Sequence, residues 1–321
     1  MHTPSITAIG TANPDFHTSQ EEFVAFATKF QDLEKQDARR LNALAYSSGI
    51  KKRHSVLADF TTSAGKLFIY ENGSTQNPNT SSRMEAYKDQ ALKLSVNAVR
   101  NMPERSFEVS EITHLITVSC TGMYAPGLDI ELIKSLGLNS HVQRTAINFM
   151  GCYAAFTALK AAWSMAKADP QAKVIVICVE LCSLHFQRSN NLDNLLSNTI
   201  FADGAAAALI ESDNNKHGLE LSAFHCDLTF DDGENMAWAI TDHGFNMRLS
   251  SYVPAIINEN IKPLTNKLLS ALGLNKDDVS YYAIHPGGKK ILQEIEKALE
   301  ITHDDNRYAY QVLSEYGNMS S

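Results

Sequence analysis

The chain has 321 residues, of which 44% are hydrophobic and 20% are charged, and its formal net charge is −8. This composition is typical of a globular protein large enough for two domains or for two halves of one domain. The acidic balance does not favour a nucleic-acid partner, and no apolar run approaches the roughly 20 residues of a membrane span.

The cysteines and the first residues indicate the compartment. The five cysteines show neither metal-ligand nor disulfide-framework spacing; they are Cys120, Cys152, Cys178, Cys182 and Cys226. The chain starts without a basic region or an apolar run, so no signal peptide is predicted. We therefore expect a cytoplasmic protein whose thiols stay reduced.

The N-terminal third is predicted to be mostly helical. A short strand over residues 5–10 precedes one long helical pattern over residues 20–46. Lys51, Lys52 and Arg53 then form a basic cluster in an acidic chain, which is either a solvated helix end or a clamp for phosphate groups. Residues 71–83 are rich in Asn, Ser and Thr and predict a loop, after which an amphipathic helix follows.

The middle of the chain alternates between strands and helices. Strands are predicted at residues 114–119, 145–149, 174–179 and 205–210, and helices at residues 128–136 and 152–168. Alternation of this kind favours α/β layers. The polar residues of the 152–168 helix form one narrow stripe, so we expect this helix to pack on nearly all sides.

A polar break at residues 213–215 precedes a second half of similar order. This half is predicted to contain two or three strands within residues 219–250, with turns at 231–233 and 242–244, a helix over 254–272, and a strand over 280–284 that is followed by a helix. The repeated order predicts an internal duplication into halves 1–213 and 214–321. Both halves would be α/β units.

Cys152 is the first candidate for chemistry. It follows Gly151 at the start of the apolar helix, where free backbone N–H groups and the helix dipole favour a thiolate. Taken alone, it is either a small buried cysteine or a nucleophile. His285, on a Pro-Gly-Gly loop after a predicted strand, and Asn318, in the position equivalent to Cys152, are the candidate companions.

The chain resembles the type III polyketide synthases, the chalcone-synthase-like enzymes of the thiolase fold. The resemblance rests on five motifs in order: residues 8–14 (AIGTANP), the 151–152 helix start (GC), 201–207 (FADGAAA), 284–288 (IHPGG) and 317–321 (GNMSS). It implies two pseudo-duplicated α/β halves in a layered αβαβα arrangement. It also implies a homodimer.

The resemblance implies an acyltransferase that makes a polyketide such as a pyrone, a resorcinol or a chalcone. Cys152 would hold an acyl-CoA starter as a thioester and would pair with His285 in the resting enzyme. His285 and Asn318 would stabilise the carbanion formed when malonyl-CoA loses CO₂. No metal or organic cofactor is implied.

Further residues are assigned to substrate binding by the same resemblance. Phe201 and Met247 match two gatekeeper positions between a CoA tunnel and the cavity, and Cys182 and His185 match positions that line that cavity. The basic cluster Lys51-Lys52-Arg53 matches the entrance that meets the CoA phosphates.

Some alternatives stay open at this level. The duplication predicts a second buried helix and two strands after Asn318, and the sequence ends at Ser321, so we expect a truncated C-terminal end. A single-condensation ketoacyl synthase, a hydroxymethylglutaryl-CoA-type synthase and an inactive homologue that only dimerises are the alternatives within the fold. A papain-like cysteine protease shares the order Cys, His, Asn, but its local cysteine signature is absent.

Overall fold

The structure is a computed structural model, which describes residues 3–31, 33–61, 68–69, 77–104, 107–189, 191–212, 218–229, 236–250 and 252–321. A six-stranded sheet runs through the first half in the order β5-β4-β6-β7-β1-β8. Its strands are β1 (Ser5–Ala12), β4 (His114–Ser119), β5 (Gln143–Asn148), β6 (Lys173–Leu181), β7 (Asp203–Glu211) and β8 (Leu219–Glu220). Strands β5, β4 and β6 are parallel, and β7 pairs antiparallel with β6 and β1.

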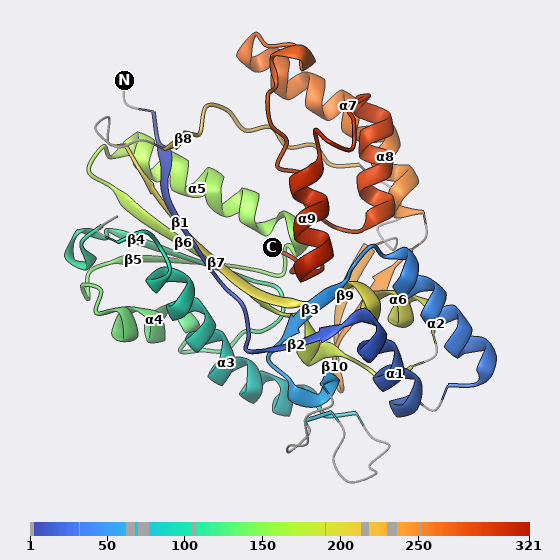
Figure 1. Cartoon of the computed structure of the whole chain (residues 1–321). Helices are drawn as coiled ribbons and strands as arrows, with labels where there is room; N and C mark the ends of the chain where they lie inside the picture. The colour runs from blue at the N-terminus through green and yellow to red at the C-terminus, as the bar shows by residue number, and fades with distance from the viewer. Residues whose placement is uncertain are drawn as a thin grey trace.

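Helices cover both faces of this sheet. Helices α3 (Thr80–Arg100) and α4 (Leu128–Leu136) lie on one face, and α5 (Ala154–Ala168) lies on the other (Figure 1). The two central parallel strands, β4 and β6, are buried on both faces, as in other covered parallel sheets. In β4, Leu115 faces the α3 core and Ile116 faces the α5 core. The predicted α/β layering is therefore present.

Helix α5 buries a single face. Its fully buried residues recur every four positions and are all alanine: Ala154, Ala158, Ala162 and Ala166. Small residues at this spacing let the helix lie close to the sheet. The prediction that this helix packs on nearly all sides is wrong for this structure, because Phe156 is 47% exposed.

The N-terminal helical pattern is two helices rather than one. Helix α1 (Gln20–Phe30) ends at the C-cap Gln31, and α2 (Lys35–Ser47) begins four residues later. The break lets both helices pack their apolar faces on one core, which holds Phe23 and Leu41. Two short strands, β2 (Phe16–Ser19) and β3 (Lys52–Ser55), flank this helical pair and join each other.

Helix α3 begins earlier than the sequence indicated. Its N-terminus is at Thr80, capped by the side chain of Asn79, which accepts a hydrogen bond from Ser82 N–H. The predicted loop over residues 71–83 is thus helical from Thr80 onward, because an asparagine cap outweighs the weak helix propensity of the Thr-Ser-Ser run. Residues 71–76 of that prediction lie outside the described part.

The second half supplies helices and one hairpin. These elements are β9 (Met236–Thr241), β10 (Gly244–Leu249), α7 (Val253–Leu272), α8 (Lys289–Leu299) and α9 (Arg307–Tyr316), and α6 (Leu192–Ile200) packs on β10. The hairpin turn predicted at 242–244 is present. The predicted strand over 280–284 is wrong, because within the described residues no other strand pairs with it. Two predicted features lie outside the described residues. They are the polar break at 213–215, which includes the boundary between the predicted halves, and the turn at 231–233.

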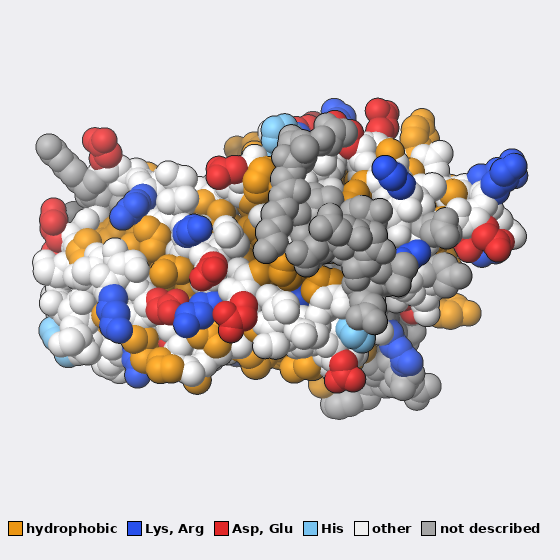
Figure 2. Space-filling view, turned by 90° about the horizontal axis from the view of Figure 1, so that it is seen from below, with side chains coloured by type: hydrophobic (Ala, Val, Ile, Leu, Met, Phe, Trp, Pro, Cys, Tyr) orange, Lys and Arg blue, Asp and Glu red, His pale blue; other side chains and the backbone are white. Residues whose placement is uncertain are grey.

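The surface carries charges of both signs. On the face shown in Figure 2, acidic and basic side chains are interspersed among apolar patches, so the described part of this face offers no continuous basic surface. Among the helices described, none combines the length and the apolar character needed to cross a bilayer.

Candidate active site

Cys152 lies in a tight turn that joins strand β5 to helix α5. The backbone changes direction there through two left-handed residues, Phe149 with φ of 59° and Gly151 with φ of 68°. Gly151 adopts this conformation without steric cost, whereas Phe149 carries a Cβ and stores backbone strain, as residues at functional sites often do. A short 3-10 helix, Gly151–Tyr153, then leads into α5 and holds Cys152 ahead of it.

The Cys152 thiol is held in its protonated form. Its Sγ lies 3.9 Å from Ser320 Oγ, to which it donates a hydrogen bond. Burial, together with the nearby Glu180 carboxylate, raises the pKa of Cys152 to about 11. The thiolate paired with His285 that the sequence predicts stays a prediction. Desolvation of the charged sulfur opposes the thiolate more strongly than the hydrogen bonds favour it.

His285 supplies a neutral imidazole. Burial lowers the pKa of His285 to about 4, so the ring is uncharged at pH 7. Its Nε2 is buried and has no hydrogen-bond partner among the described residues. The loop that carries it is tightened by a hydrogen bond of 2.9 Å from Gly287 N–H to His285 O. A neutral ring with an unpartnered nitrogen can accept or donate a proton there.

Asn318 is fixed by both its backbone and its side chain. Its N–H donates to Ile200 O at 3.0 Å, and its carbonyl accepts from Ala202 N–H at 2.9 Å. The side-chain Nδ2 donates to Gly287 O at 3.2 Å, and Oδ1 accepts from Ser320 N–H at 2.9 Å. Asn318 is only 3% exposed. The amide is therefore held rigidly beside the loop that carries His285.

Cys152, His285 and Asn318 line one cavity. The cavity has a volume of about 1200 Å³ including its open mouth, and Cys120, Cys182, Phe201, Trp238, Met247 and Ser320 are among its other lining residues. The three side chains come from the end of β5, the loop before α8 and the segment after α9, which are far apart in the sequence. The fold thus gathers a thiol, a neutral imidazole and an amide around one void.

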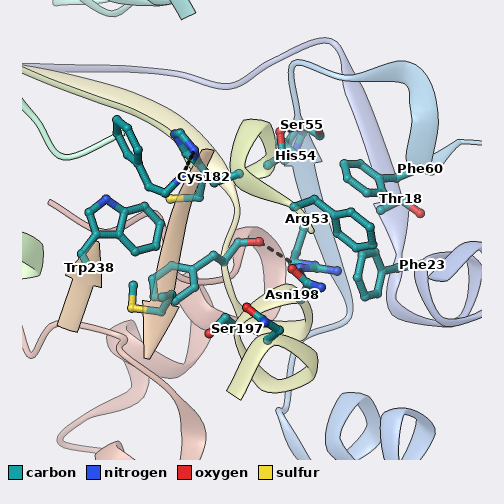
Figure 3. A pocket seen from close by; sticks show the side chains of 17 residues that line it. Thr18, Phe23, Arg53, His54, Ser55, Phe60, Cys182, Ser197, Asn198 and Trp238 are labelled. Carbon is teal, nitrogen blue, oxygen red and sulfur yellow. Dashed lines mark hydrogen bonds between the residues drawn. The ribbon is translucent and has the colours of Figure 1, made fainter. Parts of the chain in front are cut away.

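A second cavity adjoins the first. It has a volume of about 570 Å³ including its mouth, and it shares Cys182, Phe201, Trp238 and Met247 with the first cavity. Figure 3 shows Trp238 on one side of this second cavity and Phe23, Phe60 and Thr18 on the opposite side. The predicted gatekeepers Phe201 and Met247 and the predicted lining residue Cys182 therefore stand between two spaces.

His185 also lines the second cavity, but its ring is immobilised. Its Nδ1 accepts from Phe245 N–H at 2.9 Å, so Nε2 carries the proton and donates to Thr121 O at 2.7 Å. The ring stacks on Phe245 with a centroid distance of 4.2 Å. Burial lowers the pKa of His185 to about 3. His185 is therefore a neutral wall of the cavity with both nitrogens occupied.

The basic cluster does not form one exposed entrance. Lys51 is exposed, and Lys52 Nζ lies 3.6 Å from Glu315 Oε2 at the surface. Arg53 is only 5% exposed, and its Nη1 donates to Asn198 O at 2.6 Å and to Phe201 O at 2.8 Å. The expectation that Arg53 meets CoA phosphates at the surface is wrong, because alternation along β3 turns its side chain into the core.

Two residues near the site are absent from the sequence prediction. Glu180 is buried at the end of β6 and accepts hydrogen bonds from Cys120 N–H at 3.0 Å and from Thr121 Oγ1 at 2.7 Å. The sequence feature that could have identified Glu180 is its position as a charged residue at the end of an otherwise apolar strand. Trp238 donates from Nε1 to Cys120 O at 2.7 Å. No spacing in the sequence connects that tryptophan with the cavity.

Family models match almost the whole chain. The model described as "Chalcone and stilbene synthases, N-terminal domain" matches residues 3–214, and the model of the C-terminal domain matches residues 224–321. "Probable polyketide synthase 1" of Dictyostelium discoideum is 30% identical over 98% of the chain, which spans 10% of that relative. "Alpha-pyrone synthesis polyketide synthase-like Pks18" of Mycobacterium tuberculosis is 30% identical over 74% of the chain and 62% of its own length. The chain thus corresponds to less than two thirds of either relative.

Solved structures share the fold. PKS-I from the brown alga Ectocarpus siliculosus superposes with a TM-score of 0.93 and 30% identity, over 100% of this chain and 86% of the algal one. The C-terminal type III polyketide synthase domain of Steely1 from Dictyostelium superposes with a TM-score of 0.87 and 28% identity, over 99% of this chain and 88% of that one. The thiolase-like α/β fold expected from the sequence motifs is therefore confirmed.

Proposed function

The chain belongs to the family of chalcone and stilbene synthases, the type III polyketide synthases, and from this premise we propose that it condenses malonyl-CoA onto an acyl-CoA starter held on Cys152. The condensation is iterative and yields a polyketide. The observation that carries the proposal is the shared cavity, which brings together the thiol of Cys152, the imidazole of His285 and the amide of Asn318.

In the proposed first step, Cys152 Sγ attacks the carbonyl carbon of the starter thioester. The thiol is protonated at rest, so a base must remove its proton, and neutral His285 with its unpartnered Nε2 is suited to that task. The sulfur–carbon bond to CoA breaks, and the departing CoA sulfur takes the proton from His285. The acyl group then remains on Cys152 as a thioester.

In the second step, malonyl-CoA loses CO₂ and the electron pair passes to the thioester oxygen as an enolate. An N–H of His285 and the Nδ2 group of Asn318 stabilise that oxygen, and one such donor contributes about 2.7–4 kcal/mol. Asparagine suits this role because its amide stays neutral. The carbanion attacks the acyl carbon on Cys152 and expels the thiolate, which accepts the extended chain for the next cycle.

The remaining assignments complete the proposal. Phe201, Met247 and Cys182 select the acyl chain at the boundary of the two cavities, and His185 shapes the second cavity. Lys51 and Lys52 meet the CoA phosphates at the surface. We propose halves 1–213 and 214–321, with support from the two family-model ranges. We also propose a homodimer in the cytoplasm without a resident cofactor; free thiols at all five cysteines agree with that compartment.

A direct test incubates the protein with malonyl-CoA and a panel of acyl-CoA starters and detects products and acyl-enzyme by mass spectrometry. We expect a starter-derived mass increase on Cys152 and a malonyl-dependent product. Cys152→Ala should lose both, and Asn318→Ala should retain the acyl-enzyme while product formation falls about 10²–10³-fold. Cys226→Ala, a change at an exposed cysteine, is the matched control. A chain that is never acylated and forms no product with any starter overturns the proposal.

A further inference from the structure

Arg53 is a buried cation with an unused hydrogen-bonding edge. Only 5% of the residue is exposed, and Nη1 alone is engaged, by two backbone carbonyls. Nε and Nη2 are both buried and have no hydrogen-bond partner among the described residues. Buried polar groups in native proteins nearly always have partners, so two free donors on one guanidinium call for a ligand.

The groups around Arg53 do not supply that partner. Its guanidinium lies 4.1 Å from the centre of the Phe23 ring, which covers one face. The Asp203 carboxylate is near enough to raise the pKa of Arg53, although burial dominates and lowers that pKa to about 9. The Asp203 oxygens accept instead from Val56 N–H at 2.8 Å and from Ser183 N–H at 2.7 Å. Arg53 stays charged at pH 7, and its Nε and Nη2 have no hydrogen-bond partner among the described residues.

Arg53 lines the second cavity. Among the described residues that line this cavity, Arg53 carries the only permanent charge, and the rest of the wall is aromatic or neutral and polar. Figure 3 shows Arg53 beside Asn198 in the middle of the cavity wall, between Trp238 and Phe23. The site therefore combines an uncharged wall with one fixed cation.

The two unpartnered donors of Arg53 indicate the chemical class of the ligand. The Nε–H and Nη2–H bonds of a guanidinium are parallel, and they match the two oxygens of a carboxylate in a bidentate pair. Such a pair would also offset the desolvation of the buried cation. A carboxylate offers each donor its own charged oxygen, whereas a single neutral oxygen would have to accept from both donors and would leave the cation unneutralised.

The cavity adjoins the space around Cys152 across the wall of Cys182, Phe201, Trp238 and Met247. We propose that Arg53 binds the carboxylate at the far end of an acyl chain whose other end is the thioester on Cys152. This inference rests on the proposed function and narrows it to ω-carboxyacyl-CoA substrates. Arg53 is then a specificity-determining residue of the starter.

The test compares matched acyl-CoA probes in the absence of malonyl-CoA. Adipoyl-, suberoyl- and sebacoyl-CoA are paired with hexanoyl-, octanoyl- and decanoyl-CoA, which have the same chain lengths but methyl ends. The rate of Cys152 acylation is followed by intact mass spectrometry. For at least one length we expect the carboxylate-ended chain to be favoured about 10–100-fold, as hydrogen bonds to charged groups imply.

Two variants separate binding from folding. Arg53→Lys keeps the positive charge but loses the two parallel N–H donors of the guanidinium. This variant should abolish the preference for carboxylate-ended acyl chains. Since Nη1 also holds two backbone carbonyls, that variant can unfold, so Asn194→Asp leaves Arg53 intact and adds a competing anion to the cavity wall. It should reduce acylation by the carboxylate-ended chains alone. Asn191→Asp adds the same charge to the N-cap of the same helix, outside the cavity, and should preserve the preference.

The outcomes distinguish the two proposals. Equal acylation by both members of every pair overturns the Arg53 assignment and leaves the proposed function standing. Absence of acylation by all six probes, together with no product from the wider starter panel, overturns the proposed function itself. Calorimetric binding of free adipate without any acyl-chain preference would also contradict the assignment, because the carboxylate would then belong to a separate small molecule.

Discussion

At the scale of single residues, burial shifts the titrating groups of the site toward their uncharged forms. Desolvation raises the pKa of Cys152 to about 11 and that of Glu180 to about 7, and it lowers the pKa of His285 to about 4. Each shift favours the neutral form, as expected for groups removed from water. The thiol is therefore protonated at pH 7 in this structure.

Glu180 should make stability depend on pH. Its pKa in the folded chain, about 7, lies above its ordinary value of 4.5, so the folded state binds the proton more tightly. The stabilisation is complete below the unfolded pKa and is lost as pH rises through the folded one, by up to about 3 kcal/mol. Glu180→Gln removes this titration. Denaturant unfolding should show the variant gaining stability relative to the parent chain between pH 5 and about 7.5.

The comparison of the Glu180→Gln variant with the parent chain isolates the titration of Glu180. His285 also titrates, with the opposite effect on stability, but it does so in both proteins. The folded pKa of His285 is depressed, so its contribution grows as pH rises toward 6.5 and is common to both proteins. A stability difference that stays constant with pH would show that Glu180 is not a proton-binding group of the folded state.

At the scale of elements, close packing of α3 on the sheet depends on a glycine in β1. A Cβ on Gly10 would lie 2.1 Å from Ala98 O and 2.7 Å from Met102 N. Both are backbone atoms, which cannot move aside as a flexible side chain does. The helix can lie this near to the strand only where the strand has no side chain.

Gly10→Ala should therefore destabilise the fold. The added methyl forces α3 away from β1, and overpacking of this kind costs about 1–3 kcal/mol, with the upper end expected because the obstacle is backbone. Thr11→Ala, at the exposed neighbouring position of β1, should change the free energy of unfolding by less than about 0.5 kcal/mol. Equal stability of Gly10→Ala and the parent chain would contradict the packing at this contact.

At the scale of the whole molecule, the six-stranded sheet has an edge that no other strand of the described residues covers. Strand β5 is the end strand of the six-stranded sheet, and each of its residues is exposed or partly exposed. Exposed edges offer free backbone groups to another strand, and natural proteins cover or charge them. A second copy of the chain that pairs along β5 would cover this edge, in agreement with the proposed homodimer.

Light scattering after size exclusion tests this arrangement. We expect a particle of twice the mass of the chain. Ala146→Lys, which adds a charge to an exposed position of β5, should yield a monomer, because edge lysines block strand pairing. Gln171→Lys, which adds the same charge at an exposed turn before β6, should leave the dimer intact. A dimeric Ala146→Lys protein would place the interface elsewhere.

Much of the first half could be predicted from local pattern. Strand β4 and helix α4 have the predicted bounds, and β5, β6 and β7 differ by a few residues at their ends. Their apolar runs are long and separated by clear turns, so the pattern alone decides them. The break between α1 and α2 and the early start of α3 depend on caps and on packing against a shared core, which a local pattern does not contain.

The sequence by itself determined the family of the protein, the α/β layers and the three residues proposed for chemistry, because motifs and periodicity are properties of neighbouring positions. Only the tertiary structure decided that these three share one cavity, that Arg53 points inward instead of meeting solvent, and that Glu180 and Trp238 adjoin the site. Burial decides charge state and accessibility, and burial arises from contacts between segments that are distant in the sequence.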